Sequence, residues 1–247
     1  MIRTTLAAAA LAALPSLASA FDIDAMSEAE RAAFRAEIRA YLLDNPEVLM
    51  EAIGVLEARE ATTQAATDEA LVTANYDALV RDGHSWVGGN PDGDVTIIEF
   101  LDYRCGFCRR AFPEVEELVA SDGNIRLIVK EFPILGEQSS LASRFAIATK
   151  LAAGDDAYKA IHDELMGFRG NISQDALMNL AAAQGLDAAA IQTAMALPQV
   201  EEIIAENRSL AQAMQITGTP TFVIGGQMLR GFLPLEGMRG LVAEERG

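Results

Sequence analysis

Two cysteines carry the most distinctive chemistry in this sequence. Cys105 and Cys108 are the only two in the chain, and Gly106 and Phe107 separate them. An apolar run at 95–100 precedes the pair and a helical pattern follows it, which predicts a strand, then the cysteines, then a helix start. Unpaired backbone N–H groups at a helix start stabilise an anion such as a thiolate. We therefore expect Cys105 to be the attacking sulfur with a low pKa, and Cys108 to be the partly buried resolving sulfur.

A structural disulfide and a metal site are two other roles for the cysteine pair. A purely structural disulfide is disfavoured, because closing so short a loop restricts the unfolded chain by only roughly 2 kcal/mol, against about 3 kcal/mol for a 15-residue loop. Zinc needs four ligands, and the chain adds only His84 and His162, without ligand-like spacing. Two thiolates could still bind Cu(I), a soft ion, so a copper site at Cys105 and Cys108 stays open.

The excess of acidic residues indicates which kinds of partner this chain is not suited to bind. The chain has 247 residues, about half of them apolar, which is enough for one large domain or two small ones. Its 36 acidic and 19 basic residues give a net charge of −17. This balance argues against nucleic acid as a partner, because phosphate contacts need clustered Lys and Arg. It argues equally against an anionic membrane surface, and it identifies no positively charged partner.

The first twenty residues have the pattern of a signal peptide. A short positive region at 1–3 is followed by an Ala/Leu-rich stretch at 6–17 and by the small residues Ala18-Ser19-Ala20, so the mature chain is expected to begin at Phe21. No later stretch reaches about 18 uninterrupted apolar residues. We expect an exported, soluble protein without a membrane anchor, in a bacterial periplasm, where disulfides can persist.

Residues 21–83 are expected to form an N-terminal helical segment. Ser27 and Glu30 are spaced as a capping box, and Asn45-Pro46 ends one helix and begins the next. Both helices carry an apolar stripe, and short isolated helices are marginal in water. The stripes must therefore be buried, either on the chain's own domain or on copies of the same segment in an oligomer.

Residues 84–247 are expected to form the second domain. A turn cluster at 90–94 precedes the strand at 95–100, and the helix after the cysteines should run to about residue 120. The pattern then predicts a strand at 125–132, helices over about 138–215, paired strands at 221–224 and 227–230 around Gly225-Gly226, and a last helix after Pro234. Thr219-Pro220 directly precedes a strand, where Pro cannot donate to a ladder, so a cis peptide bond is the natural candidate there.

Together these features resemble the DsbA-like branch of the thioredoxin superfamily. The resemblance rests on Cys-Gly-Phe-Cys, the helical insertion and the stretch 216–222, and it covers about residues 84–247. It implies an α/β thioredoxin fold with an all-helical insertion, preceded by the N-terminal helical extension. It further implies that Thr219 and Pro220 face the disulfide and hold extended substrate backbone. No cofactor is implied beyond the redox-active pair of Cys105 and Cys108.

Two more residues match the family by position. Glu99 lies in the strand before Cys105, where DsbA-like proteins carry a buried acid, and Lys130 resembles the usual partner of that acid. The resemblance implies that Glu99 shuttles a proton for Cys108. The alternative for Lys130 and Glu131 is that both are solvent-exposed charges at a strand end. A carboxylate inside an apolar strand, such as Glu99, must be paired or protonated.

The residues between the cysteines depart from DsbA itself. DsbA-type oxidases carry a His within the motif, whereas Gly106-Phe107 is closer to the Gly-Tyr of the isomerase DsbC, and Thr219 also suits an isomerase. We therefore expect a couple less oxidising than the approximately −120 mV of DsbA and nearer the approximately −180 mV typical of isomerases. Arg104, Arg109 and Arg110 flank the motif, either to favour the thiolate or as a solvated helix face.

The combination of both segments is similar to the ScsC family of periplasmic DsbA-like proteins linked to copper sensitivity. Some members form trimers through the N-terminal region and act as disulfide isomerases or reductases, whereas others are monomers. The resemblance implies a homo-oligomer, with a trimer as the expected form. It would act on unfolded or misoxidised periplasmic proteins and be reset by a reductase in the membrane. The alternatives are a monomeric DsbA-like dithiol oxidase and a Cu(I)-binding copper-tolerance protein that uses the same thiols.

Overall fold

The structure is a computed structural model that describes residues 24–247. The expected signal peptide at residues 1–20 and the expected mature start at Phe21 lie outside the described residues. The chain divides into two compact units, with the division between Arg59 and Glu60. The long helix α2 (Glu47–Ala74) contributes residues to both units. None of the helices within 24–247 is long and apolar enough to cross a lipid bilayer.

The first unit consists of α1 (Glu28–Asp44) and the beginning of α2. The expected capping box is present, because the Ser27 hydroxyl accepts from the Glu30 N–H and the Glu30 carboxylate accepts from the Ser27 N–H. Asn45 ends α1 by donating its backbone N–H and its side-chain amide to the Tyr41 carbonyl. No residue of α1 is buried. Large apolar side chains therefore remain exposed along both helices, among them Ile38, Tyr41, Leu43, Leu49, Met50, Ile53, Val55 and Leu56.

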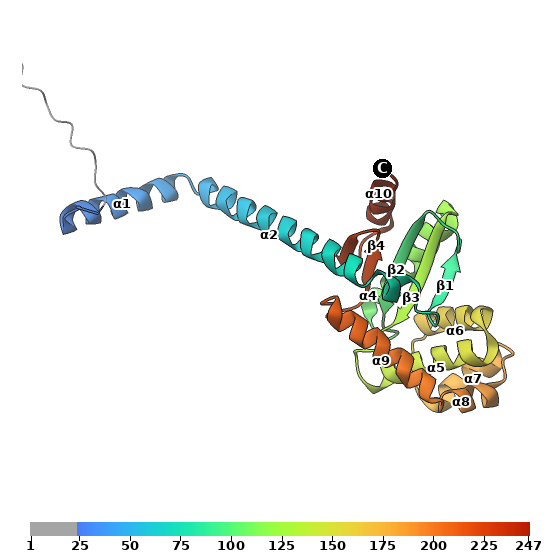
Figure 1. Cartoon of the computed structure of the whole chain (residues 1–247). Coiled ribbons are helices and arrows are strands. Elements are labelled where there is room, and N and C mark those ends of the chain that lie inside the picture. Colours follow the sequence, from blue (N-terminus) through green and yellow to red (C-terminus); the bar gives the residue numbers. More distant parts are fainter. Residues whose placement is uncertain (1–23) are drawn as a thin grey trace, which may run out of the picture. The chain divides into compact units, whose positions relative to one another are not determined.

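The second unit is built on a five-stranded sheet in the order β1-β3-β2-β4-β5 (Figure 1). The strands are β1 (Trp86–Gly89), β2 (Val95–Leu101), β3 (Ile125–Glu131), β4 (Thr221–Ile224) and β5 (Gln227–Arg230). The central pair β2 and β3 is parallel and the other three pairings are antiparallel. The sequence patterns predicted four of these strands. They missed β1, which has only four residues, two of them glycines.

Helices make every long connection in this unit. The parallel strands β2 and β3 are joined by α4 (Gly106–Asp122), which begins directly after Cys105. An all-helical insertion lies between β3 and β4, and its helices α5 to α8 cluster beside the sheet (Figure 1). It comprises α5 (Glu137–Ala153), α6 (Asp155–Gly167), α7 (Gln174–Ala183), α8 (Ala188–Ala194) and α9 (Pro198–Ala213), and α10 (Leu235–Arg246) ends the chain. The expected thioredoxin-type fold with a helical insertion is confirmed.

Strand alternation divides the core of this unit between the two faces of the sheet. On one face, Ile97 and Leu101 pack with α4, α10 and the insertion. On the other face, Ile98 and Phe100 pack with α3 (Tyr76–Val80) and with the end of α9. Two adjacent residues of a strand therefore lie in different environments, which matters for the charged residues described below.

Residues 60–83 belong to the second unit, although the expected domain boundary was residue 84. Val72, Leu79 and Val80 are buried against the second face of the sheet. Asp68 of α2 also forms a two-pronged ion pair with Arg230 of β5, at 2.6 and 2.8 Å. These contacts are made with distant parts of the chain, so the local sequence pattern of 60–83 did not indicate where the compact unit begins.

Candidate functional site

The two cysteines lie where the C-terminal end of the central strand β2 turns into α4. Cys105 is the N-cap residue of α4, and Cys108 lies in its first turn. Asp102 shapes the turn, because its buried carboxylate accepts the backbone N–H groups of Arg104, Ile134 and Leu135, at 2.7, 2.8 and 3.0 Å. The loop that follows β3 is thereby tied to the loop that carries Cys105.

The environments of the two sulfurs differ in the way expected from the sequence. Cys105 keeps 6% of its surface exposed, whereas Cys108 is 0% exposed, so only Cys105 can meet a partner in solution. A hydrogen bond from Cys108 lowers the pKa of Cys105 to about 5, and the backbone N–H groups of Phe107 and Cys108 act in the same direction, against the effect of burial. Burial raises the pKa of Cys108 far above its ordinary value. At neutral pH Cys105 is therefore a thiolate and Cys108 a thiol.

Thr219 and Pro220 complete the surface around Cys105. The Thr219–Pro220 peptide bond is cis, as expected. The Thr219 carbonyl lies 3.1 Å from the Cys105 sulfur, which donates its hydrogen to it when protonated. Gly106 and Phe107 are exposed beside the sulfur, and Phe107 has 60% of its surface accessible. The structure therefore brings together Cys105, Cys108, their two intervening residues and the Thr219–Pro220 pair.

Glu99 lies on the face of the sheet that Cys108 packs against. Its side chain is buried, and its Oε1 atom has no hydrogen-bond partner among the described residues. Burial raises the pKa of Glu99 to about 8, and the negative charges of Glu116, Cys105 and Glu131 add to the effect. The charged form of Glu99 in turn raises the pKa of Cys108. The expected buried acid is thus close to the resolving cysteine.

A network around Glu131 was missed by the sequence patterns. The expected alternative, a solvent-exposed charge, is wrong for this residue, which is buried at the end of β3. Its carboxylate accepts hydrogen bonds from the hydroxyl groups of Tyr103, Tyr158 and Ser143, at 2.7, 2.6 and 2.7 Å. Burial raises the pKa of Glu131 to about 7 although these three hydrogen bonds lower it. Because Tyr103 lies two residues before Cys105, this network anchors the strand end that leads to the site.

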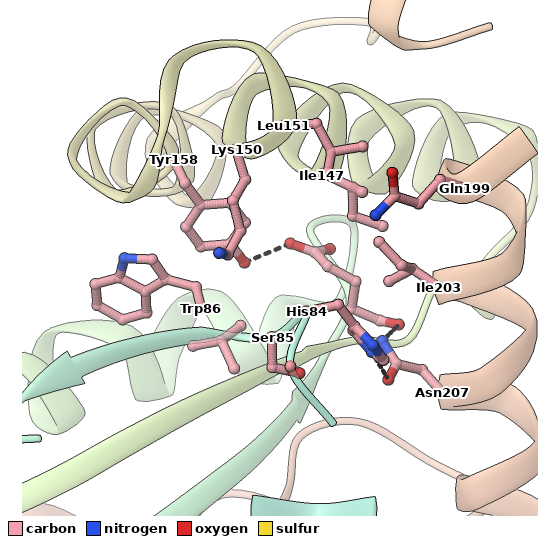
Figure 2. Close-up of a pocket in the computed structure, with 13 residues that line it drawn as sticks. His84, Ser85, Trp86, Ile147, Lys150, Leu151, Tyr158, Gln199, Ile203 and Asn207 are labelled. Carbon is pink, nitrogen blue, oxygen red and sulfur yellow. Dashed lines mark hydrogen bonds between the residues drawn. The ribbon is translucent and has the colours of Figure 1, made fainter. Parts of the chain in front are cut away.

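A separate cavity of about 220 Å³ lies beside Glu131, between the sheet and the insertion (Figure 2). Trp86 and Tyr158 form one side of it, and Gln199 and Asn207 of α9 lie on another. Tyr158 and Glu131, which are joined by a hydrogen bond, both line this cavity. Neither cysteine lines the cavity, so it is not part of the surface around Cys105.

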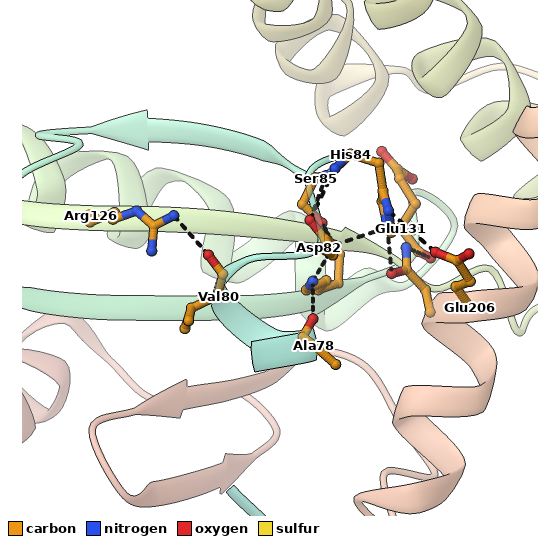
Figure 3. Close-up of polar contacts among 10 residues, drawn as sticks. Ala78, Val80, Asp82, His84, Ser85, Arg126, Glu131 and Glu206 are labelled. Atoms are coloured by element: carbon orange, nitrogen blue, oxygen red, sulfur yellow. Dashed lines mark hydrogen bonds and ion pairs between the residues drawn. The ribbon is translucent and has the colours of Figure 1, made fainter. Parts of the chain in front are cut away.

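Lys130 does not lie beside Glu99, which corrects the expected pairing. In the register of β2 and β3, Glu99 is opposite Val129 and Phe100 is opposite Lys130, so the two charged side chains project from opposite faces of the sheet. Lys130 instead donates to the Ala78 carbonyl at 2.9 Å and forms an ion pair with Asp82. Asp82 also binds His84 and Ser85 (Figure 3). Lys130 is fully buried, so the solvent-charge alternative is also wrong for it.

We expect the Asp82–Lys130 pair to be needed for the stability of the second unit. The Asp82→Asn substitution leaves the ammonium group of Lys130, which is 0% exposed, without a counter-charge, at a cost of about 3–5 kcal/mol in the free energy of unfolding. Urea denaturation measures this cost. The matched control is Asp77→Asn, because the Asp77–Arg81 pair is exposed and should contribute under about 1 kcal/mol.

The double variant Asp82→Asn/Lys130→Met separates a pairing effect from simple disruption. It should recover much of the lost stability, because no unpaired charge remains buried. Burial pushes the pKa of Asp82 up, but hydrogen bonds from His84, Lys130 and Ser85 hold it below its ordinary value. The contribution of the pair is therefore complete above about pH 4, the pKa of Asp in the unfolded chain, and is lost as the pH falls further. Equal losses for Asp82→Asn and Asp77→Asn would contradict this role.

Comparisons with known protein families follow the division of the chain. The model of the DSBA-like thioredoxin domain matches residues 96–243. The model of the copper resistance protein ScsC N-terminal domain matches residues 30–62. The first match covers more than half of the chain and includes both cysteines and the Thr219–Pro220 pair. The second covers most of α1 and the first part of α2.

Solved structures resemble the second unit alone or nearly the whole chain. A thioredoxin-like oxidoreductase from Silicibacter pomeroyi is 40% identical, with 70% of this chain and 98% of that chain covered and a TM-score of 0.66. Proteus mirabilis ScsC in a transitional conformation is 26% identical, with 91% and 98% covered and a TM-score of 0.65. The second similarity therefore extends into the N-terminal helices.

Among curated proteins, similarity extends to much longer chains. The Na⁺/H⁺ antiporter NhaA 1 of Salinispora arenicola is 29% identical over 156 residues, which are 63% of this chain and 24% of that protein. The chain therefore spans about a quarter of the length of the first curated relatives that it matches.

The lowered pKa of Cys105 gives a direct prediction. The rate at which iodoacetamide alkylates Cys105 in the reduced protein should be half-maximal near pH 5, because the thiolate is the reacting species, whereas an ordinary thiol titrates near about pH 8.5. Mass spectrometry of quenched samples follows the reaction. Cys108→Ala should move the midpoint to higher pH, because the hydrogen bond from Cys108 is the largest cause of the lowered pKa. A wild-type midpoint above about pH 7 would overturn this assignment.

Proposed function

The chain belongs to the DSBA-like thioredoxin domain family, and from that premise we propose that it is a thiol–disulfide oxidoreductase that acts on protein disulfides. The observation that carries the proposal is the contrast between the two sulfurs. Cys105 is accessible with a pKa of about 5, and Cys108 is inaccessible with a strongly raised pKa. This pairing suits one sulfur for attack and the other for resolution of the mixed disulfide.

The proposed reaction has two exchange steps. The Cys105 thiolate attacks one sulfur of a substrate disulfide, an S–S bond to Cys105 forms, and the second substrate sulfur leaves as a thiolate. Cys108 then gives up its proton and attacks Cys105, which releases the first substrate sulfur and oxidises the pair. Glu99 is the proposed proton acceptor for Cys108, because its pKa of about 8 leaves it able to bind or release a proton near neutral pH. Lys130 lies on the other face of the sheet and takes no part.

The preferred direction in this proposal is isomerisation or reduction. A Cys105 pKa of about 5 lies between the values of about 7 for thioredoxin and about 3.5 for DsbA. A thiolate stabilised to this intermediate degree favours a couple less oxidising than that of DsbA. Gly106 and Phe107 place no histidine beside the thiolate, and the exposed Phe107 ring offers an apolar contact to partly unfolded chains. Thr219 and Pro220 are proposed to hold the substrate backbone.

The N-terminal helices support the proposal of an oligomer, with a trimer as the expected form. The apolar side chains of α1 and of the beginning of α2 are exposed in the isolated chain, and this segment matches the ScsC N-terminal domain. An oligomer would bury these side chains and present several thiolates to one misfolded substrate. We place the protein in the periplasm because of the leader pattern at residues 1–20, with unfolded or misoxidised proteins as substrates and a membrane reductase as the resetting partner.

Substitution of each cysteine tests the reaction. Cys105→Ser should abolish the refolding of scrambled ribonuclease, because the attacking thiolate is lost. Cys108→Ser should retain attack but accumulate mixed disulfides with the substrate, which are visible on non-reducing gels. Recovery of ribonuclease activity against time is the measurement. A Cys105→Ser protein that refolds the substrate at the wild-type rate would refute the proposed function.

Light scattering tests the assembly. The protein lacking residues 1–20 should have the mass of an oligomer, and a chain that begins at Glu60 should be a monomer, because it keeps the second unit but loses the exposed stripe. The substitution pair Ile38→Asp/Ile53→Asp in the longer chain should have the same effect without shortening it. A monomer at every concentration in the unaltered chain would remove the assembly from the proposal.

Two alternatives have distinguishable outcomes. If oxidation of a reduced substrate is faster than isomerisation and the protein is a monomer, the protein is a DsbA-like dithiol oxidase. The second alternative is Cu(I) bound by the thiolates of Cys105 and Cys108, and its support is the softness of thiolate ligands, because the match to the copper resistance protein ScsC N-terminal domain covers residues 30–62 and contains neither cysteine. The buried Cys108 fits such a site poorly, because its raised pKa opposes the second thiolate. Tight Cu(I) binding without isomerase activity would support the copper function.

A further inference from the structure

The cations of the second unit are divided into two groups. Eight of its fourteen Lys and Arg residues form ion pairs with Asp or Glu, including Lys130, Arg230 and Arg246. The other six form none within residues 60–247. Arg126 and Arg208 donate to backbone carbonyls away from the motif, those of Val80 and Pro133. The remaining four, Arg104, Arg109, Arg110 and Arg169, lie around the cysteine pair and are called the arginine cluster below.

Contacts within the structure bring three members of the cluster, Arg104, Arg109 and Arg169, close to one another beside Cys105, and Arg110 follows Arg109 in α4. Arg104 precedes Cys105, and its guanidinium donates to the Gly170 carbonyl at 3.3 Å, which places it next to Arg169 in the chain. Arg109 follows Cys108 and donates its Nε–H to the Tyr103 carbonyl at 2.7 Å. Burial lowers the pKa of Arg109, and the charges of Arg104 and Arg169 lower it further, so the three guanidinium groups are near one another.

The side chains of this cluster are held in place without a carboxylate at ion-pair distance among residues 60–247, although the charges of Asp102 and Cys105 act on Arg109. Carbonyl groups orient Arg104 and Arg109, and the ring of Phe232 lies 4.6 Å from the guanidinium carbon of Arg110. One nitrogen of Arg109, Nη2, is buried without a hydrogen-bond partner among the described residues. The closest carboxylate in sequence, Asp102, is buried and accepts three backbone N–H groups.

The acids further along α4 are also occupied by other groups. Glu114 accepts the N–H of Leu235, and Glu116 and Glu117 pair with Lys159 and Arg239. The cluster therefore gathers beside the cysteine motif four of the six cations of residues 60–247 that form no ion pair. This happens in a chain whose net charge is −17. At physiological ionic strength charges are screened beyond about 8 Å, so a bound segment responds to the local arginines more than to the distant acids.

We propose that the arginine cluster makes this protein selective for protein segments in which Asp or Glu flanks the disulfide-bonded cysteine. This inference rests on the proposed exchange activity and specifies its substrate class. The arginines are not among the main causes of the low pKa of Cys105, which are Cys108, Thr219 and the backbone N–H groups, although the charge of Cys105 does act on Arg109. The apolar side chains of Ile134 and Leu135, which the Asp102 carboxylate holds beside Arg104, are exposed and complete a surface for a mixed acidic and apolar segment.

Symmetric peptide disulfides test the selectivity. The reduced protein is mixed with the disulfide of acetyl-Glu-Cys-Glu-amide, of acetyl-Gln-Cys-Gln-amide or of acetyl-Lys-Cys-Lys-amide, and acid quenching with mass spectrometry gives the rate of mixed-disulfide formation. In this step two electrons of the Cys105 thiolate form the new S–S bond, and one peptide leaves as a thiolate that takes a proton from solvent. Each rate is divided by that of dithiothreitol with the same peptide, which removes the effect of charge on the peptide sulfur.

The expected normalised rate is roughly ten-fold higher for the Glu peptide than for the Gln peptide, and lowest for the Lys peptide, as two or three exposed ion pairs would give. The double variant Arg104→Gln/Arg169→Gln should reduce the ratio of Glu to Gln to below about three-fold. Both side chains are exposed, so the fold should tolerate the change. The control is Arg239→Gln, which removes one positive charge beside Ser121 at the far end of α4 and should leave the ratio at its wild-type value.

Each outcome decides between selectivity and a general effect on the thiolate. If the arginines act on the thiolate, the double variant should change the rates of all three peptides by the same factor and raise the midpoint of Cys105 alkylation, and the proposal is then wrong. A wild-type ratio near one, or a ratio unchanged in the double variant, would also overturn it. Exchange with the Gln peptide that is lost in Cys105→Ser keeps the proposed function standing in these cases. Absence of exchange with every peptide would instead count against both.

Discussion

A negative charge on Cys105 is the feature on which the rest of this site depends. The charge is stabilised by the Cys108 thiol and by the N–H groups of the first turn of α4, and both exist only if α4 begins at Gly106. The central strand β2 delivers the chain to that point, and the buried Asp102 carboxylate fixes the turn between them by accepting three backbone N–H groups. The attacking sulfur is thus held by backbone geometry, which a change of exposed side chains leaves intact.

The same geometry sets the opposite condition for Cys108. Its sulfur lies beneath the first turn of α4, and the charge of Glu99 opposes a second negative charge there. Burial is the main cause of the raised pKa values of Glu99 and Glu131, and the charge of Glu131 adds to the effect on Glu99. In the proposed function, a Cys105 thiolate beside a protonated Cys108 supports isomerisation, because slow resolution by Cys108 would give a substrate time to rearrange within the mixed disulfide.

The residues that follow local rules could be predicted from the sequence. The capping box at Ser27, the strand before Cys105, the helix after it and the cis bond at Pro220 each depend on neighbours in the chain. The position of Lys130 could not be predicted in this way, because it depends on the register of β2 and β3. Once Glu99 is opposite Val129, alternation places Lys130 on the other face. A family pattern that pairs the two residues by sequence position alone carries no information on register.

The same physical reason explains why the sequence patterns missed the tertiary contacts of residues 60–83 and of Glu131. Val72 and Leu79 are buried against a sheet that is formed by residues far along the chain, and Asp82 pairs with Lys130 of that sheet. The weak apolar stripe of 60–83 therefore did not indicate these tertiary contacts. In the sequence, Glu131 has the pattern of an exposed charge at a strand end. Its hydrogen-bond partners, Tyr158 of α6 and Tyr103 of the turn after β2, come from distant parts of the chain. The arginines near Cys105 differ from these residues, because the sequence alone shows that Arg104, Arg109 and Arg110 flank the motif.

What sequence cannot show is which arginines remain without an acid. In a chain with almost twice as many acids as bases, the expectation for any arginine is a nearby carboxylate. Arg230 and Arg246 each pair with a carboxylate, whereas the four arginines of the cluster pair with none among residues 60–247. Burial lowers the pKa of Arg109, and repulsion from Arg104 and Arg169 lowers it further, so gathering these charges costs stability. The charges of Asp102 and Cys105 leave the pKa of Arg109 below its ordinary value, and in the proposed selectivity the carboxylates of the substrate, beside the sulfur that Cys105 attacks, offset more of this cost.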